Sequence, residues 1–207
     1  MNGWHGGALV ALGAFHGINP AMGWLFAAAI GFREQTRRAL FGALGPIAAG
    51  HAASMAVTIL LVEELRVVAS DAAIRIAAAL ALLAFAATRV ARDHRHPRWV
   101  GMRLRNRELA VWSFLMSTAH GAGLMLIPVL MGTRVEGHDH MLMVGSLAIV
   151  AAAVAVHSVA MIAVAGGAAF VVYEFVGVGV LRRGWLNLDR VWVYALAGGA
   201  AAVLFVG

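Results

Sequence analysis

Long, continuously apolar stretches separated by short polar segments dominate the sequence. A helix of about 20 apolar residues crosses the hydrocarbon core of a bilayer, which is roughly 30 Å thick. The strands of a membrane barrel would alternate apolar and polar residues, and these stretches do not alternate. The pattern therefore predicts an all-α integral membrane protein with six transmembrane helices, over about 7–32, 39–62, 72–88, 109–132, 141–181 and 191–206.

The fifth stretch, about 141–181, is too long for a single crossing. Gly166 and Gly167 inside it predict a kink, or a change into a helix that lies along the membrane interface. The sequence is consistent with either assignment of 166–183, to the fifth span or to an interfacial helix.

Composition excludes the soluble classes of protein. Hydrophobic residues make up 62% of the 207 residues and charged residues only 13%, whereas a soluble domain has about a quarter of its residues charged. The apolar excess also excludes disorder. The absence of cysteine excludes thiol redox relays and thiolate metal sites. We expect a protein of a bacterial inner (plasma) membrane that is not an enzyme.

The arginines indicate the orientation in the membrane. The net charge is +6, but the arginines cluster between apolar stretches, which is typical of membrane loops and not of a nucleic-acid surface. The positive-inside rule puts the Arg-rich loops in the cytoplasm and both termini outside. Thirteen of the sixteen arginines lie in alternate loops, namely Arg33, Arg37, Arg38, Arg89, Arg92, Arg95, Arg98, Arg103, Arg105, Arg107, Arg182, Arg183 and Arg190.

Histidines at matching positions indicate an internal repeat. His16 and His120 are 104 residues apart, each followed by glycine, and His51 and His157 are 106 residues apart. Three spans per repeat is an odd number, so the second repeat must be inverted, as in many transporters. We expect one transmembrane domain, 1–207, with repeat one over about 7–90, an Arg-rich cytoplasmic loop over about 89–108, and repeat two over about 109–207.

The same four histidines are the candidate metal ligands. His16, His51, His120 and His157 each lie well inside an apolar span, and at 1.5 Å per residue all fall within one or two turns of the midplane. Ionisable residues are costly inside a membrane, so they mark functional sites by default. Imidazole suits Zn, Ni, Co and Cu. A single histidine of this kind is equally explained by a hydrogen bond between helices.

Methionines share helix faces with three of these histidines. Met55 follows His51 by four residues, Met161 follows His157 by four, and Met116 precedes His120 by four. A thioether beside an imidazole suits Cu(I). Methionine is also a flexible core filler, so these three are accessory candidates only.

The first span carries a helix-breaking signal just after its histidine. Gly17, Asn19 and Pro20 would loosen or break the helix, and the freed carbonyls and the Asn19 amide could coordinate or guide a cation. A packing kink is the simpler explanation. Pro128 in the fourth span is a weaker signal of the same kind.

Two further groups of residues carry potential chemistry. The outer loop contains Glu136, His138, Asp139 and His140, which could capture or release a divalent cation, although a solvated loop of this composition is also ordinary. Glu174, in the apolar tail of the fifth stretch, is a candidate proton-relay acid or an interfacial residue.

Six spans in an inverted three-plus-three arrangement, with a His-Gly…Asn-Pro break in the first span, resemble the LysE-like transporter superfamily. That superfamily includes small amino-acid and metal-cation exporters and the CcdA-like membrane proteins. Asn19-Pro20 is similar to the Asn-Pro of the CcdA-like branch, but the cysteines of that branch are absent, and so is the His-x4-Asp-His pattern of the nickel/cobalt exporters. The resemblance implies transport of a cation or small solute and leaves the substrate open.

Three functional hypotheses follow. The first is a proton-coupled transporter of a transition-metal cation with a midplane histidine site. The second is a b-type haem protein with bis-His ligation, although four histidines at one level would crowd two macrocycles. The third is a membrane assembly or chaperone subunit without transport, whose histidines only pack. The expected partners are the bilayer and the metal ion, with no nucleic acid, and a homodimer is one option for the assembly.

Overall fold

The computed structural model describes residues 3–65, 68–91, 105–131, 140–177 and 188–205, and these residues form helices and short connections without a strand. The predicted all-α fold class is therefore confirmed for the described part of the chain. The helices are α1 (Gly3–Ile18), α2 (Trp24–Glu34), α3 (Arg37–Leu65), α4 (Asp71–Ala91), α5 (Asn106–Ala119), α6 (Ala122–Met131), α7 (His140–Val171) and α9 (Leu188–Phe205), with a 3-10 turn at Pro20–Met22 and a π-helical turn at Val172–Val176.

Three of the described helical segments are long and apolar enough to cross a membrane. They are Arg37–Leu65, Asp71–Thr88 and Ala148–Val176, and two shorter apolar helices cover Gly6–Ile18 and Val193–Leu204. These lengths and compositions indicate association with a membrane. The first and fourth apolar stretches of the sequence are each divided between two helices, so the six crossings stay a prediction.

The break in the first stretch follows directly from its sequence. The Asn19 side chain accepts a hydrogen bond from the Ala21 amide at 2.9 Å, which caps the 3-10 turn, and Pro20 begins that turn. Gly23 then adopts a φ of 114°, a left-handed conformation that favours glycine. The predicted break after His16 is confirmed.

The fourth stretch breaks in an equivalent place, which the sequence analysis did not predict. Helix α5 ends at Ala119, His120 caps it, and Gly121 adopts a φ of 65° before α6 begins. Helix α6 runs through Pro128, so this proline is not the break. Glycine, which has no Cβ, adopts the positive φ at this break without strain.

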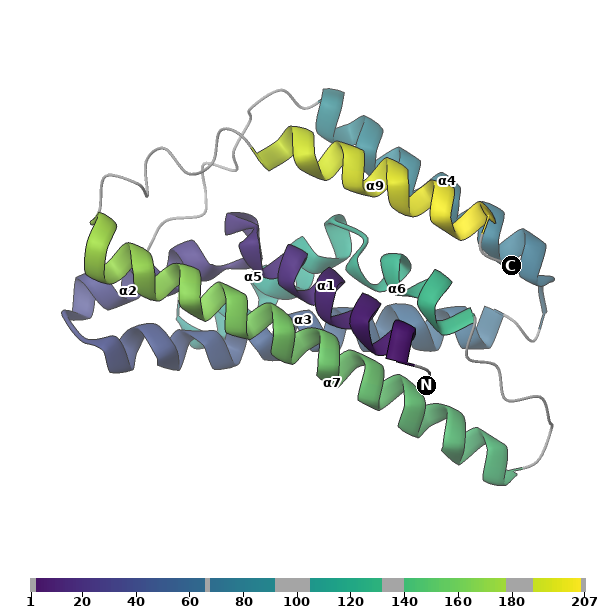
Figure 1. Ribbon diagram of the computed structural model, residues 1–207, viewed down its shortest axis with the longest axis horizontal. Helices are drawn as coiled ribbons and strands as arrows, with labels where there is room; N and C mark the ends of the chain where they lie inside the picture. The colour runs from purple at the N-terminus through teal and green to yellow at the C-terminus, as the bar shows by residue number, and fades with distance from the viewer. Residues whose placement is uncertain (1–2, 66–67, 92–104, 132–139, 178–187, 206–207) are drawn as a thin grey trace.

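The helices pack in pairs that are distant in the sequence. Helix α1 packs against α7, α3 against α5, and α4 against α9. Figure 1 shows α4 and α9 side by side along one edge of the molecule, beside the group formed by α1, α3, α5, α6 and α7. The first two pairs bring all four candidate histidines into one group of helices.

Helix α7 passes through Gly166 and Gly167 without a break, so no change of element occurs at the two glycines. Gly166 instead makes room for α3, because a Cβ at this position would lie 2.9 Å from Leu44 Cδ1. The helix changes only at Val172, where a π-helical turn continues it to Val176. Residues 166–176 therefore belong to the fifth helical segment, and 178–183 lie outside the described residues.

Candidate functional site

Three of the four candidate histidines meet in the structure. The ring centroids of His16 and His157 are 5.1 Å apart, those of His51 and His157 are 5.4 Å apart, and those of His16 and His51 are 5.8 Å apart. The three residues come from α1, α3 and α7, and their side chains are fully buried. We call these three residues the histidine cluster.

The fourth histidine, His120, is 1% exposed at the break between α5 and α6. It caps α5, the helix that packs against α3, which carries His51.

His16 and His120 are held in the same way. In each, Nδ1–H donates to the carbonyl four residues earlier, at 2.8 Å to Leu12 and at 2.6 Å to Met116. A carbonyl can only accept, so these bonds put the proton on Nδ1 and leave the lone pair of a neutral ring on Nε2. This is the arrangement in which a backbone carbonyl orients a metal-binding imidazole.

His51 and His157 have polar atoms that the rest of the described protein does not satisfy. Neither ring nitrogen of His51 has a hydrogen-bond partner among the described residues. The His157 ring lies near the backbone of Leu9. Neither of its nitrogens makes a hydrogen bond of acceptable geometry with any described residue. Buried polar atoms of this kind are rare and call for a ligand, an ion or water.

Glycines allow the close helix approach that forms the cluster. A Cβ at Gly13 would collide with the carbonyl oxygen of His157, and a Cβ at Gly17 would collide with that of Met161. Gly50 lies in the same way against the Ala110 carbonyl of α5. Small residues four apart let membrane helices approach closely. Gly13 and Gly17 thus bring α1 onto α7 at the level of the histidines.

The cluster is not arranged as a completed metal site. The rings of His51 and His157 stack with only 11° between their planes, and no group of three or more His, Cys, Asp or Glu side chains among the described residues has the geometry of a metal-binding group. Tetrahedral ligation needs the nitrogens to converge at about 2.0–2.1 Å from a zinc-like ion. The rings would have to rotate about their side-chain torsions to achieve this.

The accessory ligand candidates lie on different sides of the cluster. Met55 is buried among Leu9, Ile59, Ala122, Leu126 and Ala153, which we call the far-side cluster together with it. Met161 belongs to a second apolar group, which includes Ile47, Leu109 and Trp112. We call this group the Arg-side cluster, because it lies toward the ends of α3 and α5 that carry arginines. Met116 packs against the Arg-side cluster and is half-buried. Each sulfur has the surroundings of a core filler.

The amide of Asn19 is partly used by the fold itself. Its oxygen accepts from the Ala21 amide, and its Nδ2 has no hydrogen-bond partner among the described residues although the side chain is only 3% exposed. The capping bond fixes which end of the amide is the oxygen. The part of the Asn19 amide without a partner is therefore the Nδ2 donor. A donor suits water or another acceptor better than it suits a cation.

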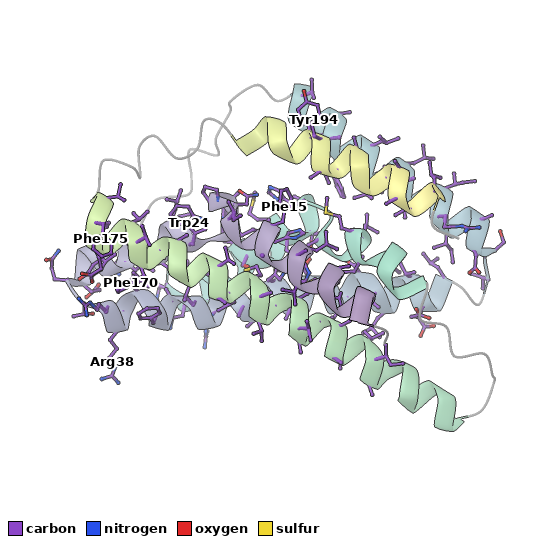
Figure 2. All side chains as sticks on the ribbon, viewed as in Figure 1. Phe15, Trp24, Arg38, Phe170, Phe175 and Tyr194 are labelled. Carbon is purple, nitrogen blue, oxygen red and sulfur yellow. The ribbon has the colours of Figure 1, made fainter. Side chains whose placement is uncertain are left out.

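Glu174 lies at an end of the molecule and is paired. Arg37 of α3 donates to both of its carboxylate oxygens, at 2.6 and 3.1 Å, and the Arg37 guanidinium also lies 5.7 Å from the centre of the Phe170 ring. Figure 2 shows Phe170 and Phe175 at the end of α7, near Arg38 of α3. This bidentate ion pair ties α7 to α3. It holds Glu174 at the Arg-bearing end of α3, away from the histidine cluster.

The outer-loop ligands cannot be placed in the same way. Glu136, His138 and Asp139 lie outside the described residues. His140 is the first residue of α7, and its side chain is also outside the described part.

Hydroxyl groups around the cluster were not recognised in the sequence. Ser54 of α3 and Thr118 of α5 share a hydrogen bond of 2.8 Å, and Ser113 donates to the Ile47 carbonyl at 2.7 Å. Ser113, Ser117 and His120 recur every three or four residues, so the helical period alone would have put them on one face of α5.

Comparisons with protein-family models, with curated proteins and with solved structures find no significant match to this chain. The function of the chain is therefore inferred from its residues and their geometry.

Proposed function

We propose that this protein is a membrane transporter of a transition-metal cation of the Cu, Ni, Co or Zn class. The observation that carries the proposal is the histidine cluster, in which three fully buried rings from three helices are in mutual contact. A buried ionisable group in a membrane-spanning segment is expensive. Two of the three buried rings have nitrogens without a hydrogen-bond partner in the described structure. A cation bound by neutral imidazoles explains why three such rings lie together.

The proposal includes six crossings in two inverted repeats, as in the LysE-like superfamily. If the first three spans correspond to the last three, exchanging the repeats converts the α1–α7 pair into the α5–α3 pair and leaves the α4–α9 pair unchanged, and all three pairs occur. Both broken spans break beside their histidine, and His16 and His120 make the same bond to the preceding turn. These correspondences support the repeat.

Transport through such a site would be coupled to protons by competition. A ring that ligates a metal must be neutral, so metal and proton compete for the same lone pairs. In inverted-repeat transporters the binding groups lie near the midplane, beside discontinuous helices, and access alternates between the two sides. The breaks at Asn19 and Gly121 are the equivalent features here.

Contact between the rings argues against the haem alternative. Bis-His ligation puts the macrocycle between two imidazoles. With centroids 5.1–5.8 Å apart, the rings of the histidine cluster touch one another and leave no room for a macrocycle between them.

Elemental analysis of the purified protein tests the proposed function. We expect a transition metal, present as purified or after loading with Zn²⁺, Ni²⁺, Co²⁺ or Cu⁺, at a fixed ratio to protein and without a Soret absorption band. A Soret band would establish the haem alternative. If the protein contained no metal and showed no Soret band, the assembly subunit without transport would be favoured.

Metal affinity should depend on pH. The ordinary imidazole pKa is about 6.5, and only the neutral ring binds a metal, so binding should be full above that range and weaken as the pH falls through it. Each proton that the metal displaces should cost about tenfold in affinity per pH unit. Zn²⁺ titration between pH 8 and pH 5 measures this. An affinity that does not change over this range would exclude competition between protons and the metal there.

A further inference from the structure

Outside the histidine cluster and Ser158 next to His157, three buried side-chain groups have no hydrogen-bond partner among the described residues. They are Ser117 Oγ, Trp112 Nε1 and Asn19 Nδ2, and the exposed fractions of these residues are 0%, 8% and 3%. Leaving such a group unsatisfied costs about 1–3 kcal/mol. Three of them need an explanation.

Their positions follow from the directions of the helices. Helix α5 starts at its Arg-rich end, at Asn106, and reaches His120 at the break. Ser117 and Trp112 therefore lie about 4.5 and 12 Å from His120 along the helix, toward that end. Asn19 follows His16 as the chain runs toward Arg33. Trp112 and Asn19 therefore lie between the histidines and the arginine-bearing helix ends. Ser117 lies level with the histidine cluster itself, because the neighbouring Thr118 bonds to Ser54, three residues past His51 on α3.

Beyond His51 toward the far side, both hydroxyl side chains of α3 have partners. Ser54 and Thr118 bond to each other, and Thr58 donates to the Ser54 carbonyl at 2.9 Å. Beyond them the far-side cluster is entirely apolar. Apolar side chains pack both sides, so within the described part of the chain the Arg side is distinguished by the partnerless groups of Trp112 and Asn19.

Corresponding positions of the two repeats show the same contrast. At the offset of 104 that relates His16 to His120, Ser117 corresponds to Gly13, Ser113 to Leu9, and Asn19 to Gly123. Gly13 lies against the His157 carbonyl, and Leu9 is 1% exposed in the far-side cluster. Ser113 and Asn19, toward the Arg side, thus stand where their far-side counterparts are leucine and glycine.

Water satisfies buried polar groups of this kind. A buried water typically makes about three hydrogen bonds to groups that lack partners. The indole N–H and the amide Nδ2 are donors, the serine hydroxyl is both donor and acceptor, and the imidazoles supply lone pairs. Together they could hold a chain of waters able to pass protons to the rings.

We propose that a water-bearing path lined by Asn19, Trp112 and Ser117 connects the histidine cluster to the Arg-rich side of the membrane, and that the far side stays sealed in this conformation. As the route by which protons reach the metal site, the path rests on the proposed function. As a one-sided access to the cluster, it can be tested without any metal.

Cysteine accessibility tests the path, because the chain contains no cysteine of its own. Ser117→Cys is nearly isosteric and reports on the path. Ala153→Cys is the matched control, because it is also small and fully buried and lies four residues before His157 on the far side. Ser113→Cys is a second reporter on the same face of α5, and Arg98→Cys, in the Arg-rich loop of the sequence, identifies the exposed side of each vesicle preparation.

The reagent is a small cationic methanethiosulfonate, applied to intact cells and to inverted membrane vesicles. A thiol reacts as its solvated thiolate, so we expect position 117 to react at least about tenfold faster in inverted vesicles than in cells, and position 153 in neither. Protection of both 117 and 113, or reaction at 153 from outside, would overturn the path. Labelling as expected in a protein that binds no metal would overturn the proposed function alone, whereas metal binding with 117 and 113 protected would overturn the path alone.

Discussion

Replacing His51 or His157 by alanine should abolish metal binding while the protein still inserts and folds. Each residue contributes a fully buried ring to the cluster, and the nitrogens of His51 have no other partner among the described residues. Loss of a ligand should weaken binding by more than the roughly 10–100-fold that loss of a supporting outer-shell group costs. Isothermal titration with Zn²⁺ or Ni²⁺, and metal content after gel filtration, measure the effect.

Matched variants separate ligation from packing. Ser158→Ala removes a buried polar group one residue from His157, so it should leave metal content unchanged. His51→Gln retains a polar side chain without an imidazole and should lose the metal as His51→Ala does. Unchanged metal content in both the His51 and the His157 variants would refute the site and favour a packing role for the rings.

Replacing Gly13 or Gly50 by alanine should prevent the protein from folding or destabilise it strongly. The new Cβ would collide with a backbone carbonyl, that of His157 or that of Ala110, and a backbone atom cannot move aside as a side chain can. Adding a methyl to a tight core costs typically about 1–3 kcal/mol even where side chains can adjust. Thermal unfolding in detergent, followed by gel filtration, measures the loss.

Two exposed glycines serve as controls, one on the helix of Gly50 and one on α7, which packs against the helix of Gly13. Gly45 of α3 and Gly167 of α7 are exposed, and a Cβ at either position meets nothing within 4 Å. Alanine there should be neutral or should stabilise the helix by about 0.5–1 kcal/mol. If all four variants were equally stable, the close approach of α1 to α7 and of α3 to α5 would be wrong.

Breaks in the helices were only partly predictable. Asn19-Pro20 is a local signal, since proline lacks an N–H and asparagine caps a turn, and the break lies where it was expected. Gly121 gives no such signal, because glycines are common in membrane helices and most of those in this chain lie within continuous helix. The pair Gly166-Gly167 predicted a kink for the same weak reason, yet α7 continues through both residues.

The role of Glu174 depended on a residue far away in the sequence. An acid in an apolar segment is consistent with a proton relay or with an interfacial anchor, and the local pattern is the same for both. Its partner, Arg37, is 137 residues away in the chain, and only the packing of α3 against α7 brings the two together.

The sequence by itself determined that the chain is helical and apolar and that four histidines lie inside its apolar segments, because helical period and hydropathy are local properties. Only the tertiary structure decided that His16, His51 and His157 meet and that Met55 and Met161 lie in separate apolar clusters. Which helices pair depends on surface fit between distant segments, such as Gly13 against the His157 carbonyl, and that fit is a property of two helices together.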